Sequence, residues 1–385
     1  MEKTRTQAVC VDLLKLIFAY CVVAIHTQAA NKAPLYLQFW TALAVPFFFV
    51  CSGYYFQVKL NTDEHESFRG GVKNYFERLL RPFIMWGSWY LLLEGANRLL
   101  IDHTSVHNVL FQLGDRLMIS SPGGGLWYVQ AVLWMLVILY LLNNRTHSLL
   151  IFTWSLCVLY VFNVVVSKCA DAGNEFQLIK QVIFPEDYSN LNFVFNGVFF
   201  PVGMVLACPE DGKAKKFLKK NCWKLFAGTV IIWFLQGHFR YNMATAVLWA
   251  LVNILRVVSL FLCALRLQIG ISPHSGIKMR KMSTRIYFLH FTVIYFVKIC
   301  SKIVGYSLNE FSLFITCAAI LTVVSYALDF DKLSWSKKTV LNYFVAEEEK
   351  SSVSCFAYYG GSRCRRDFNG RSELLSCARP DKDPF

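Results

Sequence analysis

The sequence predicts an all-α membrane protein, a polytopic bundle of about ten transmembrane helices. Of its 385 residues, 55% are hydrophobic and only 17% are charged, whereas an ordinary soluble domain has about 25% charged residues. The mean hydropathy is +0.40. The apolar residues fall in runs of about twenty, which is the length of helix that crosses a bilayer.

The apolar segments are predicted to be the membrane-spanning helices, with boundaries good to several residues. They lie at about 8–28, 38–58, 82–101, 126–143, 148–167, 192–208, 224–239, 243–264, 284–303 and 310–329. The segment nearest the N-terminus is not expected to be a cleavable signal peptide, because it is long, has no clear small-residue cleavage site and precedes further spans.

The net charge of +14 is mainly a signal of topology. If the N-terminus is cytoplasmic, most loop Lys and Arg fall on the cytoplasmic side, as in 59–81, 213–224 and 266–285. The positive-inside rule then predicts a multi-pass protein of the cytoplasmic membrane with both termini inside. Anionic membrane lipids, not nucleic acid, are the partners that this charge predicts. No CxxC pair occurs among the 13 cysteines, so no metal site is predicted.

Two parts of the chain differ in composition. Residues 1–330 contain all the apolar segments and form the predicted transmembrane domain. Residues 331–385 become polar and basic, rich in Ser, Gly and Arg, and show no helical apolar period. That composition is typical of a disordered segment, here a cytoplasmic tail.

The first segment places three ionisable residues on one helical stripe, Asp12, Lys15 and His26. Lys15 and His26 point about 20° apart and lie about 16 Å apart along the axis, with Asp12 within about 60° of both. Ionisable groups inside a span usually face a bundle interior or a water-filled cavity, so this stripe is a candidate site. The alternatives are an Asp12–Lys15 structural ion pair and a His26 that only hydrogen-bonds a backbone carbonyl.

This stripe resembles the first helix of the acyltransferase-3 family of membrane O-acyltransferases, in which an Arg and a His stand eleven residues apart. Lys15 takes the place of the Arg, and a Lys cannot form a bidentate fork. Four more stretches resemble family motifs in the same order along the chain. They are PFFFVCSGYYF at 46–56, RLLRP at 78–82, GLWYV at 125–129 and YFLH at 287–290. The resemblance covers about residues 8–330.

The resemblance implies transfer of an acyl group, usually acetyl from cytosolic acetyl-CoA, to a hydroxyl of an extracytoplasmic glycan or lipid-linked saccharide. Acetyl-CoA would be a co-substrate. His26 suits the role of general base or transient acyl carrier, with Lys15 and Asp12 beside it in the catalytic stripe. Arg78 and Arg81, on the cytoplasmic side, suit the phosphates of the donor; the alternative is that they bind lipid headgroups.

The same motifs place four more residues at the site. Ser52 and His290 are assigned to the acyl donor, although Ser52 also fits a close helix crossing. His290 is expected in the inner part of the ninth span, far in depth from His26. Trp127 and Tyr128 are assigned to the acceptor, and the alternative is an aromatic belt at the membrane interface.

Charged residues inside other spans leave two further functions open. Glu94, Arg256 and Lys298 lie inside spans and are expected to line or brace the cavity. Charged residues in several helices would equally line a permeation path, as in a transporter or flippase of a glycan or acylated intermediate. The two halves of the chain show no evident internal repeat, which many transporters have. The weakest alternative is a scaffold that recruits glycan-assembly proteins through the tail. Arg256 follows Asn253 by three residues, so both face one side of their helix.

Overall fold

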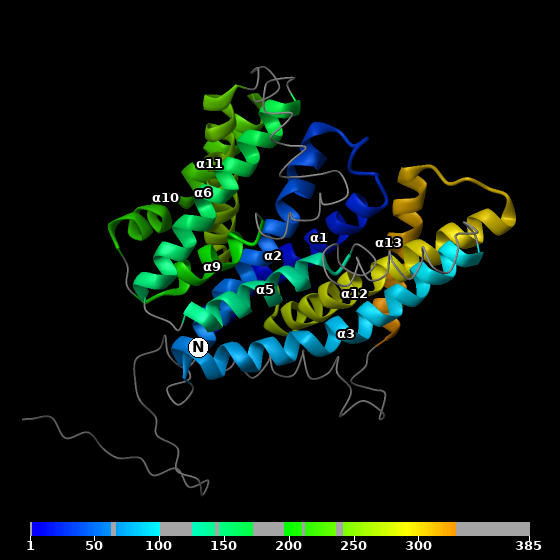
Figure 1. The fold of residues 1–385 in the computed structure, drawn as a ribbon, viewed down its shortest axis with the longest axis horizontal. Helices are drawn as coiled ribbons and strands as arrows, with labels where there is room; N and C mark the ends of the chain where they lie inside the picture. The colour runs from blue at the N-terminus through cyan, green and yellow to red at the C-terminus, as the bar shows by residue number, and fades with distance from the viewer. Residues whose placement is uncertain are drawn as a thin grey trace, which may run out of the picture.

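The computed structural model describes residues 2–62, 67–100, 125–142, 146–171, 196–209, 212–235 and 242–328 (Figure 1). Within these ranges the regular secondary structure is entirely helical. The predicted tail, residues 331–385, lies outside the described residues.

Ten helices run through the described part of the chain, and each overlaps one predicted span. They are α1 (Glu2–His26), α2 (Leu35–Thr62), α3 (Phe68–Leu100), α5 (Trp127–Leu142), α6 (Thr146–Asp171), α9 (Phe199–Ala207), α10 (Lys213–Leu235), α11 (Met243–Arg266), α12 (Pro273–Val304) and α13 (Glu310–Ala327).

Six of the described helices are long and apolar enough to cross a membrane, namely α1, α2, α6, α11, α12 and α13. Helix α5 is apolar but shorter, with 16 residues, and α9 has only 9. Helices α3 and α10 each begin with a charged stretch, which lowers their mean hydropathy. The predicted all-α membrane bundle is confirmed, with fewer long apolar helices than the ten predicted spans.

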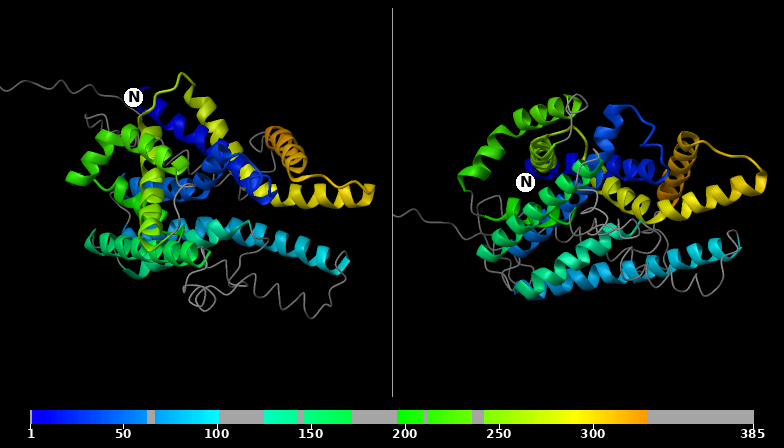
Figure 2. Two further views of the ribbon diagram at one scale, coloured as in Figure 1. Left: turned by 90° about the horizontal axis from the view of Figure 1, so that it is seen from above. Right: turned by 45° about the horizontal axis from the view of Figure 1, so that its top comes forward.

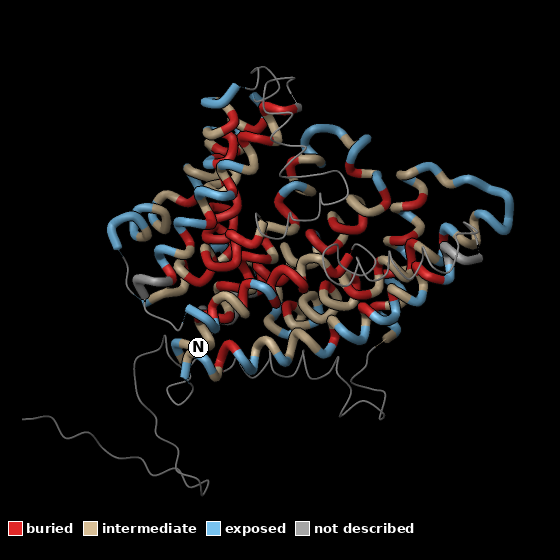
Figure 3. The backbone as a smooth tube through the Cα atoms, in the orientation of Figure 1, coloured by how far each residue is buried: buried red, intermediate tan, exposed pale blue. Residues whose placement is uncertain are grey.

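Helices α1 and α2 lie in the middle of the molecule. In Figure 1, α6, α10 and α11 lie on one side of this pair, and α3, α12 and α13 lie on the other. Buried residues concentrate where these groups meet (Figure 3). Phe47 of α2 joins the helices there, because its ring centroid lies 4.9 Å from that of Phe18 in α1 and 6.0 Å from that of Phe261 in α11.

Helices α2 and α9 cross at two glycines. A Cβ atom on Gly53 would lie 1.8 Å from the carbonyl oxygen of Phe200, and one on Gly203 would lie 2.2 Å from that of Val50. Only glycine allows this approach, because the atoms that a methyl group would meet belong to the backbone. The close crossing predicted at the Ser52-Gly53 pair is therefore confirmed at Gly53.

Helices α1 and α12 run side by side and parallel (Figure 2). A Cβ atom on Gly276 would lie 3.0 Å from Val9, near the start of both helices. Further along, Ser283 donates a hydrogen bond of 3.0 Å to the carbonyl oxygen of Lys15. The two helices therefore run in the same direction, and the polar stripe of α1 faces α12.

Helix α12 begins at Pro273, well before the predicted start of the ninth span near 284. Ser272 caps it, because its hydroxyl accepts a 3.2 Å hydrogen bond from the backbone N–H of Ser275. The helix ends at Gly305, whose φ of 70° is the left-handed conformation that glycine adopts easily. The first turns are polar, which is why an apolar run does not reveal them.

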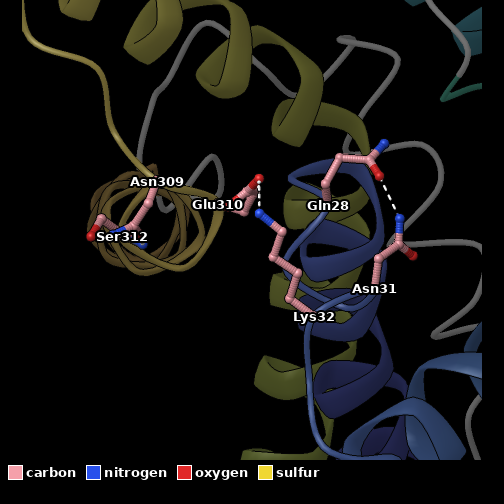
Figure 4. Close-up of polar contacts among 6 residues, drawn as sticks. All are labelled: Gln28, Asn31, Lys32, Asn309, Glu310 and Ser312. Atoms are coloured by element: carbon pink, nitrogen blue, oxygen red, sulfur yellow. Dashed lines mark hydrogen bonds and ion pairs between the residues drawn. The ribbon is translucent and has the colours of Figure 1, made fainter.

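The loop that follows α1 is tied to the start of α13 (Figure 4). Lys32 and Glu310 form an ion pair of 2.6 Å. Within the loop, Asn31 donates a 2.5 Å hydrogen bond to Gln28, which has a φ of 65°. The end of α1 and the start of α13 therefore lie on one side of the bundle, as the predicted alternation of loops requires.

Candidate functional site

Two imidazoles meet where α1 ends beside α12. His26 is the last residue of α1, and the centroid of its ring lies 5.2 Å from that of His290. The ring of Phe291 lies 4.6 Å from each of them. His290 is 1% exposed, whereas His26 is half-buried. The parallel packing of two helices thus places a buried and a half-buried histidine side by side against an aromatic wall.

The hydrogen bonding of His290 fixes which nitrogen carries its proton. Nδ1 contacts the backbone carbonyl oxygen of Tyr287, and a carbonyl can only accept, so Nδ1 is the donor. Nε2 then holds the lone pair of the neutral ring. It is buried and has no hydrogen-bond partner within the described residues. A basic nitrogen held in one orientation is what a general base needs.

The prediction that His290 lies far in depth from His26 is wrong. It followed from a ninth span that starts near 284, which would leave His290 only a few residues inside the membrane. Because α12 starts at Pro273, His290 stands about 26 Å along the helix at 1.5 Å per residue. That is enough to reach the end of α1.

Tyrosines of the neighbouring helices brace this part of α12. Tyr287 donates a 2.8 Å hydrogen bond to the carbonyl oxygen of Gly125, just before α5. The hydroxyl of Tyr90, in α3, donates to the carbonyl oxygen of Phe288. Gly125 must be glycine, because a Cβ there would lie 2.1 Å from the ring of Phe291. Helices α3 and α5 thus hold the aromatic wall against the histidines.

The other predicted members of the stripe lie deeper along α1. Asp12 is buried and lies beside Arg280 of α12, with 3.9 Å between Oδ1 and Nε. The ammonium group of Lys15 lies 5.1 Å from the ring centroid of Tyr55. The stripe therefore faces α12 and α2 inside the bundle, as predicted. Arg280 supplies a salt bridge to Asp12 that the sequence did not reveal.

Helix α12 carries a matching polar stripe that the sequence analysis does not predict. Arg280, Ser283, Tyr287 and His290 follow one another at spacings of three, four and three residues, which places them on one helical face. This spacing is the signal that could have found them. The apolar pattern does not reveal it, because it predicts a loop for the polar residues 273–283.

Arg78 and Arg81 lie one turn apart in α3, as expected if that stretch is helical. The guanidinium of Arg78 lies 4.7 Å from the ring centroid of Tyr75. Arg81 is exposed. An exposed and a half-buried guanidinium in the first half of α3 could contact phosphate groups.

Ser52 and Tyr128 join α2 to α5 through a short hydrogen-bond chain. The hydroxyl of Tyr128 donates to the carbonyl oxygen of Phe48 at 3.3 Å, so Ser52 donates to Tyr128, at 2.6 Å. The ring of Trp127 lies 6.1 Å from that of Phe49. The Tyr128 hydroxyl therefore points to α2.

Within the described residues, no three His, Cys, Asp or Glu side chains come together in a way that could hold a metal ion. The groups that this site presents for chemistry include the paired imidazoles, the charged groups of the α1 and α12 stripes, and the guanidinium groups of α3.

Comparison with known proteins identifies the family of the chain. The model of the acyltransferase-3 family, described as an acyltransferase domain, matches residues 9–329. No curated protein and no solved structure matches the chain. The matched residues include nine of the described helices whole and α1 from Val9 onward. The chain therefore belongs to the acyltransferase-3 family and is a membrane acyltransferase.

Proposed function

We propose that this chain moves an acyl group, most simply acetyl, from cytosolic acyl-CoA to a hydroxyl of an extracytoplasmic glycan, and that the reaction takes place at His26 and His290. The observation that carries the proposal is the pair of neighbouring imidazoles, of which the buried one, His290, keeps a basic nitrogen without a partner among the described residues. A sugar hydroxyl is a poor nucleophile until a base takes its proton.

In the proposed step, an imidazole nitrogen takes the proton of the acceptor hydroxyl. The hydroxyl oxygen then forms a bond to the thioester carbonyl carbon, the carbon–sulfur bond breaks, and CoA leaves as a thiolate. The proton passes from the imidazolium to that thiolate, which completes the balance. With two imidazoles in contact, a second route has one ring carry the acyl group while the other handles the proton.

The stripe on α1 and α12 supports a direction for this transfer. The cluster of Asp12, Lys15 and Arg280 lies about 15–21 Å along the helices from the histidines. If the N-terminus is cytoplasmic, this cluster and Arg78 lie toward the side that holds acyl-CoA. The histidines then lie toward the outer side, where the acceptor arrives. Both termini are cytoplasmic in this arrangement.

The test uses the full chain, purified and reconstituted in lipid nanodiscs, with radiolabelled acetyl-CoA and candidate glycan acceptors. The release of CoA thiol and the label on the acceptor are measured together. We expect both in the wild-type protein. Each should fall by about 10²–10⁴-fold in the His26→Ala variant if its imidazole acts as general base or acid.

Two outcomes would contradict the proposal. Full acyl transfer by His26→Ala at a normal protein yield would remove the catalytic role of the histidine. Net movement of a glycan across proteoliposomes without use of acyl-CoA would favour the transporter instead. Cys157→Ala, in α6 away from the site, is a matched control and should keep the wild-type rate.

A further inference from the structure

Arg256 is a buried charge on the α6, α10 and α11 side of the molecule (Figure 1). It lies in α11 and is 3% exposed. The guanidinium carbon is 4.2 Å from the ring centroid of Trp233, 5.1 Å from that of Phe39 and 5.8 Å from that of Trp249. Helices α2, α10 and α11 thus supply an aromatic cage around one cation.

Two polar side chains lie beside this cage. Asn253 precedes Arg256 by three residues on α11, and it hydrogen-bonds to Tyr160 of α6. Its Oδ1 atom is buried and has no hydrogen-bond partner among the described residues, so the amide nitrogen makes the bond to Tyr160. An acceptor atom therefore remains unused one helical turn from Arg256.

The guanidinium also has unused donors. Nε and Nη1 of Arg256 are both buried, and neither has a hydrogen-bond partner among the described residues. Ring faces attract a cation, but they do not replace the oxygen acceptors that a desolvated guanidinium loses. Within the described residues no carboxylate forms an ion pair with it.

Other charges inside the bundle are matched differently. Asp12 lies 3.9 Å from Arg280, and Arg285 donates a 2.8 Å hydrogen bond to the carbonyl oxygen of Ser325. In both cases protein atoms supply the missing partner. At Arg256 two N–H donors, and one helical turn away the amide oxygen of Asn253, have no partner among the described residues. This combination fits a ligand that carries both an anion and a hydroxyl.

We propose that Arg256 and Asn253 form a binding site for a hydroxylated oxyanion, such as an acidic sugar, a sugar phosphate or the headgroup of an anionic lipid. The anion would accept hydrogen bonds from Nε and Nη1, and a hydroxyl of the same ligand would donate to Oδ1 of Asn253. Trp233 and Trp249 would flank it with apolar ring faces. This site is built from α2, α6, α10 and α11, whereas the histidine pair belongs to α1 and α12, and it does not depend on acyl transfer.

The test measures the thermal unfolding midpoint of the full chain in phosphatidylcholine nanodiscs. Three probes are compared at constant ionic strength: glucuronate against glucose, glucose 1-phosphate against glucose, and phosphatidylglycerol added to the nanodisc lipid. We expect at least one anionic probe to raise the midpoint, by about 2–4 °C at a tenfold excess over its dissociation constant. The Arg256→Gln variant should show no such rise.

The control separates a specific site from general salt effects, since some anions stabilise many proteins by exclusion from the surface. Arg285→Gln removes another arginine of the bundle and should keep the rise. If Arg256→Gln does not fold, Arg256→Lys replaces it, because Lys keeps the charge but lacks the guanidinium donors; the rise should then fall by at least half.

A probe that raises the thermal unfolding midpoint of the wild-type protein but not that of the Arg256 variant identifies the source of the anion. A soluble sugar would indicate an acidic saccharide, and phosphatidylglycerol alone would indicate a lipid. The absence of a shift with all three probes would overturn the proposal. So would an equal shift in the wild-type protein and the Arg256 variant.

Discussion

At the scale of single residues, His26 and His290 differ in what holds them. His290 is fixed by the carbonyl oxygen of Tyr287 and enclosed by Phe291, whereas His26 stands at the end of α1, half-buried. A base whose orientation is fixed before the substrate arrives loses less freedom in the reaction. His290 therefore belongs in the proposed chemistry, although the sequence assigned it to the donor side.

We predict that His290→Gln lowers the rate of acyl transfer by about 10²–10⁴-fold, because Gln can still donate to the Tyr287 carbonyl but has no basic nitrogen. The rate is measured as CoA release in nanodiscs. His274→Gln is the matched control, since His274 lies exposed in the first turn of the same helix; it should keep the wild-type rate. Normal turnover by His290→Gln would show that the second imidazole takes no part.

The chain from Ser52 through Tyr128 to Phe48 gives a second prediction. Tyr128→Phe removes the acceptor for Ser52 and the donor to the Phe48 carbonyl, so it should lower the free energy of unfolding by about 1–3 kcal/mol. The Ser52→Ala, Tyr128→Phe double variant should lose less than the sum of the single losses. Denaturant titration of all four proteins measures this coupling, and additive losses would contradict it.

At the scale of helices, the sequence predicts the positions of the helices well wherever apolar residues are continuous. Each described helix overlaps a predicted span, and the stripe of Asp12, Lys15 and His26 faces the bundle interior as expected. The failure at α12 has a physical cause. Residues 273–283 are polar, so apolar content assigns them to a loop, yet they pack on α1 through Gly276, Arg280 and other polar contacts.

Other features of the site depend on contacts between distant parts of the chain, which one sequence does not reveal. The contact between His26 and His290 joins residues near opposite ends of the transmembrane domain. The partner of Asp12 is likewise on α12. Periodicity shows which face of a helix is polar, but it does not show which helix lies opposite.

The crossing of α2 and α9 gives a prediction at this scale. Gly53→Ala should lower the free energy of unfolding by about 1–3 kcal/mol, because its methyl group would meet the backbone of Phe200 and force the helices apart. Gly228→Ala in α10 is the control. Its methyl group would meet nothing within 4 Å, so it should raise helix stability by about 0.5–1 kcal/mol. Equal effects at both sites would contradict the close crossing.

At the scale of the whole molecule, contacts between helix ends agree with one alternating path of the chain. Asn61, at the end of α2, donates a 3.0 Å hydrogen bond to the carbonyl oxygen of Ala207, at the end of α9. The guanidinium of Arg69, at the start of α3, lies 5.4 Å from the ring of Tyr140, near the end of α5. These ends share the side that is predicted to be cytoplasmic. The ion pair of Lys32 and Glu310 joins two ends on the other side.

The last prediction concerns the orientation of the bundle in the membrane. This orientation decides which substrate reaches which end of the polar stripe on α1. Lys32 has a side chain that is 71% exposed, and Lys216 is exposed at the start of α10. In intact cells, a membrane-impermeant maleimide should label Lys32→Cys above the background of the parent protein. It should label Lys216→Cys only after permeabilisation.

Ser307→Cys is the internal control for this labelling. It lies in the loop before α13, which the ion pair of Lys32 and Glu310 holds beside the loop after α1, so it must label together with Lys32→Cys. If Lys216→Cys alone is labelled in intact cells, the protein has the opposite orientation in the membrane. The histidines would then face the cytosol, next to acyl-CoA, and the acceptor would have to be cytosolic as well.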